Sequence, residues 1–202
     1  MHELGFNTWY GWVSHLSNVY NIDLDSMTLT PNNKMLIKTK IKNHFIGRWK
    51  NEINDNQNHP KLRLYSKIKT NFSLEPYLSV PVKSKFRYAL SKIRTSSHPL
   101  EIERGRHTNP VTPVSDRTCH TCNIVEDEIH FLTNCSNYGK QRIHLYSKIQ
   151  TKCPEFSTFN NEDKFVYMLR SLDPQILSWV GKFLHESFGI RNSINESRAV
   201  TS

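Results

Sequence analysis

Four side chains that commonly bind metals lie within 17 consecutive residues of this chain: Cys119, Cys122, His130 and Cys135. Their spacing is Cys-x2-Cys-x7-His-x4-Cys, in the stretch RTCHTCNIVEDEIHFLTNC. Two residues between the first cysteines allow both sulfurs to reach one ion, and the second pair lies about one helical turn apart. Three thiolates and one imidazole form a tetrahedral ligand set that Zn²⁺ accepts. The spacing therefore predicts a zinc site of the zinc-finger type.

We expect this site to be structural, because four protein ligands close the tetrahedron and leave no position for water. Glu126, Asp127 and Glu128 lie between the two ligand pairs, and one of them could serve as a general base. We favour a solvated acidic turn that begins a helix, since carboxylates stabilise the first turn of a helix. Zinc would then contribute on the order of 10 kcal/mol to folding, as it does in small zinc modules.

The cysteines have two other interpretations, a surface pair beside an ordinary histidine and a disulfide framework. A disulfide framework requires an oxidising compartment, and residues 1–20 show no charged segment ahead of an apolar one. We therefore expect an intracellular protein, nuclear or cytoplasmic. Cys153 is expected to be a lone thiol, buried or free. His107 and His144 are alternative ligands, whereas His120 lies between Cys119 and Cys122, which already hold the metal.

The net charge of +9 is distributed unevenly along the chain. Residues 34–106 contain 17 Lys and Arg against five acids, whereas residues 1–33 and 107–135 are each acidic. Concentrated positive charge ahead of a metal module favours a polyanionic partner, and nucleic acid, either RNA or DNA, is the commonest. The alternative is a basic surface that serves only solubility.

Apolar residues recur with a helical period over most of the chain. We therefore expect a mostly α fold, a small helical domain around a Cys3His zinc module with a short strand or extended segment before it. Apolar and acidic residues alternate from Leu100 to Arg104, which suggests a brief strand ending at Gly105. The expected divisions are an aromatic N-terminal segment and loop (1–33), a basic helical region (34–97), the zinc-binding module (98–150), a C-terminal helical region (151–190) and a disordered tail (191–202).

Helices are expected near residues 9–19, 34–53, 62–68, 82–94, 138–150, 160–172 and 174–188, with an extended or turn segment at 76–81. The helix at 82–94 is crowded with cations, some of which must point away from its apolar side and could contact phosphates. Tyr88 and His107 could stack on bases. The candidate nucleic-acid contacts are Lys83, Lys85, Arg87, Lys92, Arg94, Arg104 and Arg106.

The motifs of several enzyme classes are missing from the sequence. It contains no Gly-x-x-x-x-Gly-Lys-Ser/Thr phosphate loop, no Gly-x-Gly-x-x-Gly turn and no Gly-x-Ser-x-Gly elbow. It also lacks the paired aspartates of a two-metal polymerase centre. We therefore expect a protein that is not an enzyme. No apolar run is long enough to span a bilayer, so no membrane partner is expected.

The stretch KFRYALSKIRTSSHPLEIERGRHTNPVTPVSDRTCHTCNIVEDEIHFLTNCSNYGKQR resembles the C-terminal zinc-binding region that follows the reverse transcriptase domain in non-LTR retrotransposon polyproteins. In that family a basic helix and a Leu-x-Ile-Glu-Arg-Gly-Arg type segment precede the metal cluster, and a Glu-Asp-Glu-x-His-Phe-Leu run leads into the last cysteine. Here these segments are residues 100–106 and 126–132, followed by Cys135, Tyr138 and Arg142. The match covers about residues 82–146. It is weaker upstream and absent after about residue 150.

The resemblance implies a fragment of a transposable element, an accessory region of an RNA-directed DNA polymerase polyprotein without its polymerase palm or endonuclease. Such a fragment would help to bind element RNA or target DNA during target-primed reverse transcription. The resemblance carries over the zinc ligands Cys119, Cys122, His130 and Cys135.

The main alternative is a zinc-stabilised protein-interaction module with no direct nucleic-acid role. In that case the aromatic residues Trp9, Tyr10 and Trp12 would dock onto a reverse transcriptase domain or another protein. A nuclease that uses histidines and acids near the cluster is a third hypothesis, and no residue pairing in the sequence supports it.

Overall fold

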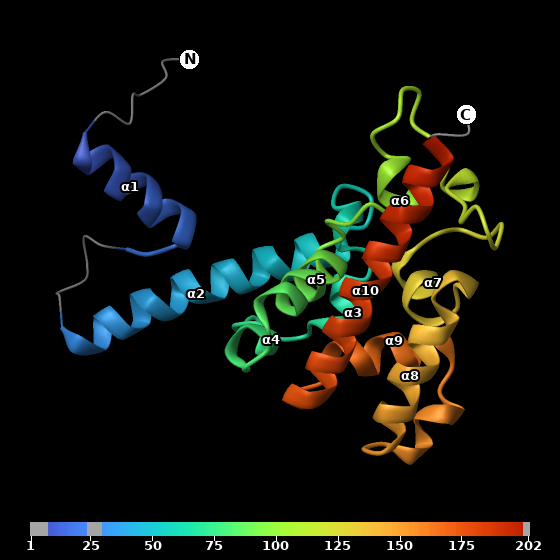
Figure 1. Cartoon of the computed structure of the whole chain (residues 1–202). Coiled ribbons are helices and arrows are strands. Elements are labelled where there is room, and N and C mark those ends of the chain that lie inside the picture. The colour runs from blue at the N-terminus through green and yellow to red at the C-terminus, as the bar shows by residue number, and fades with distance from the viewer. Residues whose placement is uncertain (1–7, 24–29, 200–202) are drawn as a thin grey trace. The chain divides into compact units, whose positions relative to one another are not determined.

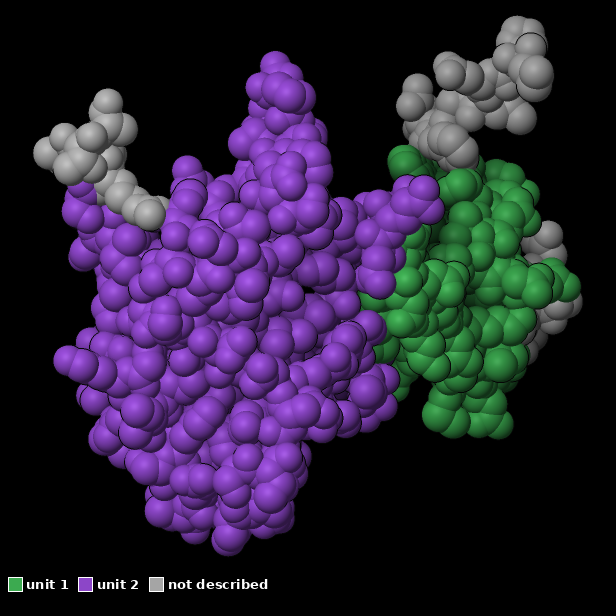
Figure 2. Space-filling view, turned by 90° about the vertical axis from the view of Figure 1, so that its right-hand side faces the viewer, with its two compact units in different colours: residues 1–55 green, residues 56–202 purple. Residues whose placement is uncertain are grey.

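The computed structural model describes residues 8–23 and 30–199, and it divides the chain into two compact units, residues 1–55 and 56–202 (Figure 2). The described residues are mostly helical, as predicted, and they contain no β-strand, only one isolated bridge between Thr118 and Val125 (Figure 1). Within the same residues, no helix is both long and apolar enough to cross a membrane.

The described part of the first unit contains two helices, α1 (Trp9–Tyr20) and α2 (Pro31–Asn54), which confirm the helices expected there. The hydroxyl oxygen of Thr30 caps α2 by accepting a hydrogen bond from the Asn33 N–H at 3.2 Å, and Pro31 occupies the first helical position. The ring of Tyr20 in α1 lies 5.1 Å from the ring of His44 in α2, measured between centroids. Residues 24–29, part of the loop expected between these helices, lie outside the described residues.

The second unit is built around α10 (Pro174–Ala199), which packs against α5 (Ser84–Arg94), α8 (Gly139–Gln150) and α9 (Asn161–Arg170). Figure 1 shows α10 running alongside α5. The core contains Leu90 and Ile93 of α5, and Val180 and Leu184 of α10. Full burial of a side chain of this size contributes about 1.5–3 kcal/mol, so this interface is a principal source of the unit's stability.

Shorter elements connect these helices. Two single helical turns, α3 (Tyr65–Ile68) and α4 (Pro76–Ser79), precede α5, and α6 (Glu101–Arg104) and α7 (Glu128–Thr133) follow it. Four 3-10 turns span Pro60–Leu62, Val114–Asp116, Ser136–Tyr138 and Pro154–Thr158. The helix expected near residues 62–68 is thus reduced to one α-turn after a 3-10 turn.

The strand expected near residues 100–104 is wrong, because this segment forms the helical turn α6. The Arg104 and Gly105 N–H groups donate to the carbonyls of Leu100 and Glu101 at 3.0 and 2.9 Å. At the start of the turn, the Glu101 N–H donates to the Glu126 carboxylate at 2.8 Å. A distant carboxylate therefore satisfies the amide that opens this turn, and the alternation in the sequence does not reflect a sheet edge.

The C-terminal helix is longer than expected. The sequence predicts a helix ending near residue 188 and a disordered tail over 191–202, but α10 continues to Ala199. The physical reason is Arg191, which is only 3% exposed and is paired with acids from distant segments. The prediction of disorder is therefore wrong for residues 191–199, and residues 200–202 lie outside the described part of the chain.

Candidate metal centre

A tight turn places the first two candidate ligands. The Cys119 N–H donates to the Ile124 carbonyl at 2.7 Å, and the Asn123 N–H donates back to the Cys119 carbonyl at 2.8 Å. Asn123 adopts a left-handed conformation with φ of 54°, which asparagine tolerates better than most residues. This turn brings Cys119 and Cys122 to the same side.

Helix α7 and the residue after its end place the other two ligands. Asp127 caps α7, and its carboxylate accepts a hydrogen bond from the His130 N–H at 2.7 Å. The Cys135 N–H donates to the His130 carbonyl at 2.8 Å, which holds the two ligand residues together. The Arg142 guanidinium of α8 then fixes the end of this segment by donating to the carbonyls of Leu132 and Cys135 at 3.1 and 2.7 Å.

The ligand atoms of the four residues all lie within 4.8 Å of one another, so the group could hold a metal ion. The Sγ atom of Cys135 lies 3.8 Å from that of Cys119 and 3.9 Å from that of Cys122. A disulfide requires about 2.05 Å between sulfurs, and all four cysteines of the chain are free. The local spacing in the sequence is thus realised as one cluster.

The electrostatics of the cluster suit a cation. Both ring nitrogens of His130 are buried and have no hydrogen-bond partner among the described residues. Burial lowers the pKa of His130, which favours the neutral imidazole that binds metals. Burial, together with the neighbouring thiols of Cys119 and Cys122, raises the pKa of the Cys135 thiol to about 12. A bound cation would favour the thiolate and would give the imidazole a partner.

The thiol of Cys122 has a more polar environment than that of Cys135. Burial acts to raise its pKa, but hydrogen bonds from Ser136 outweigh this effect, so the pKa of Cys122 lies below its ordinary value. The hydroxyl of Ser136 lies 3.3 Å from the Cys122 sulfur. Cys122 is also the least buried of the four candidate ligands, which makes it the most accessible point of the site.

The other candidate ligands do not join the cluster. The side chains of His107 and His144 are exposed and fall outside the group of four, as does that of His120. Cys153 is buried and free, at 6% exposure, as expected of a lone thiol.

The acidic run between the ligand pairs is not the solvated turn predicted from the sequence. Asp127 does cap a helix, but Glu126 and Glu128 are 5% and 0% exposed. Glu126 accepts two hydrogen bonds from the Arg191 guanidinium, at 3.0 and 2.6 Å. The prediction fails because cations from distant parts of the chain neutralise these acids, so the run becomes buried structure.

Glu128 is the centre of a second buried network. Its carboxylate accepts hydrogen bonds from Ser96 at 2.5 Å and from the His98 ring at 2.9 Å, and it is paired with Arg63. Burial acts to raise the pKa of Glu128, but the His98 hydrogen bond and the Arg63 charge outweigh it and hold the pKa below its ordinary value. Sequence reasoning missed these partners, which lie 30 or more residues away.

The seven candidate nucleic-acid contacts have different environments. Lys83 and Lys85 are exposed, and Lys92 lies 4.6 Å from the ring centroid of Tyr88, which is 63% exposed. Arg94 is 4% exposed, so the expectation that it faces outward is wrong. Of the remaining three candidates, Arg87 donates to the Val80 carbonyl at 3.0 Å, and Arg104 and Arg106 pair with Glu101 and Glu103 at 2.9 and 3.1 Å.

Comparison with known proteins provides no relative. No protein-family model, curated protein or solved structure matches this chain. The resemblance to retrotransposon polyproteins stays a prediction that rests on the quoted residues.

Proposed function

We propose that this protein is a zinc-binding module without enzymatic activity that binds nucleic acid. Zinc is the metal that the cluster fits best. A tetrahedral zinc ion with zinc–sulfur bonds of about 2.3 Å would hold its sulfurs about 3.8 Å apart. The two sulfur–sulfur distances at Cys135 are 3.8 and 3.9 Å. Three thiols and an unpartnered imidazole also match the borderline-soft character of Zn²⁺.

The proposed role of zinc is structural. With four protein ligands, the ion would join the turn at residues 119–125 to α7 and the segment that leads into α8. Helix α7 in turn packs against α9. The ion would therefore join three segments that also pack into the hydrophobic core through Phe131, Leu132 and Tyr138.

The outer face of α5 is the proposed contact surface for nucleic acid, and it is the observation that supports this function most directly. Lys85, Tyr88 and Lys92 follow one another at helical spacings of three and four, on the side opposite the buried Leu90 and Ile93. Among the described residues, neither lysine forms an ion pair, and the same holds for Lys83 just ahead of the helix. Lysines without an acidic partner are available for phosphates.

The chemistry of this face suits a flexible strand as well as a duplex. The lysines would contact backbone phosphates and give an affinity that falls with salt. The Tyr88 ring, exposed between them, would stack on an unpaired base. With the resemblance to retrotransposon polyproteins, this supports binding of element RNA or target DNA during target-primed reverse transcription, in the nucleus or the cytoplasm.

A matched pair of triple variants tests this proposal. The first replaces Lys83, Lys85 and Lys92 with glutamine. The control replaces Lys67, Lys152 and Lys182, which pair with acids in the structure. Both variants lose three positive charges, so a difference in affinity reflects the position of the lysines and their pairing with acids.

Affinity for RNA and DNA oligonucleotides would be measured across a salt series. We expect the first triple variant to bind at least tenfold more weakly at low salt. Its log–log salt dependence should be shallower by roughly 0.9 for each lost contact with duplex DNA. Equal affinities in the two variants, or binding by the wild type that is indifferent to salt, would reject the proposed surface.

A zinc-stabilised protein-interaction module is the second candidate, favoured by the exposed aromatic residues of α1. Trp9, Tyr10 and Trp12 are 79%, 72% and 53% exposed. Binding to a reverse transcriptase domain that persists at high salt, and is lost in the Trp9→Ala and Trp12→Ala double variant, would favour this function over nucleic-acid binding.

A further inference from the structure

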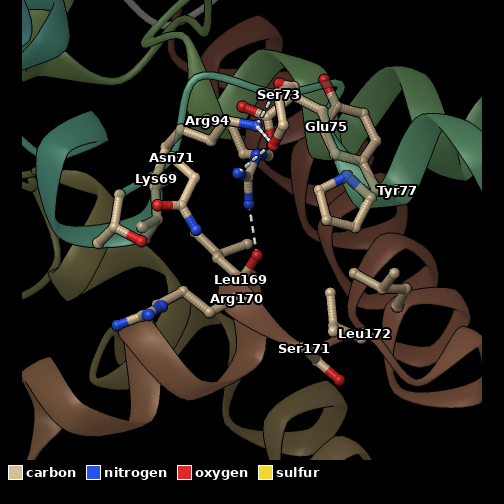
Figure 3. A pocket seen from close by; sticks show the side chains of 14 residues that line it. Lys69, Asn71, Ser73, Glu75, Tyr77, Arg94, Leu169, Arg170, Ser171 and Leu172 are labelled. Atoms are coloured by element: carbon tan, nitrogen blue, oxygen red, sulfur yellow. Dashed lines mark hydrogen bonds and ion pairs between the residues drawn. The ribbon is translucent and has the colours of Figure 1, made fainter. Parts of the chain in front are cut away.

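A cavity of about 230 Å³ opens in the second unit beside the buried Arg94 of α5. Its walls come from the segment around α3 and α4 and from the end of α9, as Figure 3 shows. The Arg94 guanidinium reaches between Glu75 and the Leu169 carbonyl and donates a hydrogen bond to each (Figure 3). The cavity is separate from the cluster of metal ligands.

The charges at this cavity do not balance. Lys69 and Arg94 are 7% and 4% exposed, and Glu75 is the one carboxylate among the residues that line the cavity. Glu75 serves both cations, at 3.9 Å from the Lys69 ammonium and 2.6 Å from the Arg94 guanidinium. Arg170, exposed at the cavity edge, adds a third positive charge. Buried charges are normally paired, so the site has an excess of positive charge.

The two buried cations differ in their unused donors. The Lys69 ammonium donates to the Ser73 carbonyl at 2.5 Å and lies 3.3 Å from the Leu74 carbonyl, so its role is to hold this loop. The Arg94 guanidinium has five N–H donors, of which the structure gives partners to the two terminal nitrogens only. Its Nε atom is buried and has no partner among the described residues. Arg94, which lines the cavity, therefore has hydrogen-bonding capacity that its partners in the structure do not use.

We propose that this cavity binds a phosphate group. A phosphate monoester carries a charge of about −1.5 to −2 at neutral pH, which matches the excess of positive charge better than a carboxylate does. Arginine N–H groups are well suited to phosphate oxygens because the fork is planar and always charged. The volume admits a phosphate together with part of the molecule that carries it. This inference does not rest on the proposed nucleic-acid function, since free phosphate and the terminal phosphate of a strand present the same chemistry.

The test measures inorganic phosphate binding to the full chain by titration calorimetry at constant ionic strength. Substitution of Arg94 itself removes two structural hydrogen bonds and could unfold the protein, so the test uses exposed residues. Arg170→Gln removes a cation at the cavity edge, and Asn71→Asp places a carboxylate among the lining residues. Arg104→Gln, on an exposed arginine elsewhere in the second unit, is the control for loss of one charge.

We expect saturable phosphate binding by the wild type and by Arg104→Gln, with affinity at least fivefold weaker in Arg170→Gln and in Asn71→Asp. No saturable binding by the wild type, or equal affinities in all four proteins, would overturn the proposal. Oligonucleotides with and without a 5′-phosphate then identify the source of the group. If the 5′-phosphate increases the affinity for the oligonucleotide, and Arg170→Gln abolishes that increase, the ligand is the end of a strand. If the 5′-phosphate does not change the affinity while inorganic phosphate still binds, the ligand is a free anion.

Discussion

Arg191 in α10 and Glu126 in the metal-binding segment form a bidentate ion pair, although 65 residues separate them in the sequence. The Nε and terminal nitrogen of Arg191 donate to the two oxygens of Glu126 at 3.0 and 2.6 Å. The same carboxylate accepts the Glu101 N–H at 2.8 Å. This pair therefore ties the C-terminal helix to the turn α6 and to the residues between the two ligand pairs.

Arg191→Met should destabilise the protein by about 3–5 kcal/mol, because it leaves the Glu126 carboxylate buried and unpaired. Lys182→Met removes a cation from the same helix whose pairing with Glu186 is half-exposed, and it should cost no more than about 1 kcal/mol. Urea denaturation of both variants measures the difference. Addition of Glu126→Gln to Arg191→Met should recover part of the loss. A cost for Arg191→Met no greater than that of the control would show that the pair contributes little.

Gly181 permits the close approach of α10 to α5. A Cβ atom at this position would lie 2.8 Å from the Phe86 Cβ and 3.0 Å from the Phe86 carbonyl oxygen. We expect Gly181→Ala to lower the free energy of unfolding by about 1–3 kcal/mol, as overpacking does. Gly189, eight residues further along α10, has no atom within 4 Å of such a Cβ.

Gly189→Ala is the matched control for this prediction. It should raise stability by about 0.5–1 kcal/mol, because alanine loses less backbone entropy in a helix than glycine does. Thermal or urea unfolding of the two variants compares them directly. Stabilisation by both substitutions would mean that α5 and α10 are not in close contact at Gly181.

We expect the buried hydrogen bonds and ion pair of Glu128 to contribute strongly to the stability of the fold. Glu128→Gln removes the charge that faces Arg63 and His98, and we expect a loss of about 3–5 kcal/mol. Glu162→Gln, at a half-exposed pair with Lys67, should cost at most about 1 kcal/mol. Denaturation curves at neutral pH distinguish the two. Similar small losses in both would indicate that water reaches Glu128.

Removal of metal should act on one unit only. A chelator is expected to increase hydrogen exchange across residues 119–135, because the thiols and imidazole then lose their common partner. Exchange across α2, whose residues belong to the first unit and include no ligand of the cluster, should be unchanged. If hydrogen exchange across residues 119–135 is the same before and after chelation, no metal stabilises this segment.

Local patterns in the sequence predicted much of this structure. The periodicity of α2, α5, α8 and α9 identified these helices, because each apolar stripe lies within a few turns. The spacing of Cys119, Cys122, His130 and Cys135 identified a cluster that the structure brings together. These features depend on residues close in sequence, so short-range rules suffice for them.

Long-range charge pairing explains the failures. Glu126 and Glu128 suggested a solvated turn because their partners, including Arg63 and Arg191, lie in other parts of the chain. The same pairing orders α10 beyond residue 190 and supports a helical turn where alternation suggested a strand. The acids at residues 126–128 lie between cysteines that were expected to form a metal site. Their cationic partners, however, could not be identified without the tertiary structure.

Elemental analysis of the purified protein tests the central proposal most directly. We predict one zinc per chain in the wild type and in Cys153→Ser, whose thiol lies outside the cluster. Cys122→Ser and His130→Ala should contain none, because each removes one of the four ligands. A folded wild-type protein that contains no zinc, and in which Cys119, Cys122 and Cys135 react as ordinary thiols, would contradict the account.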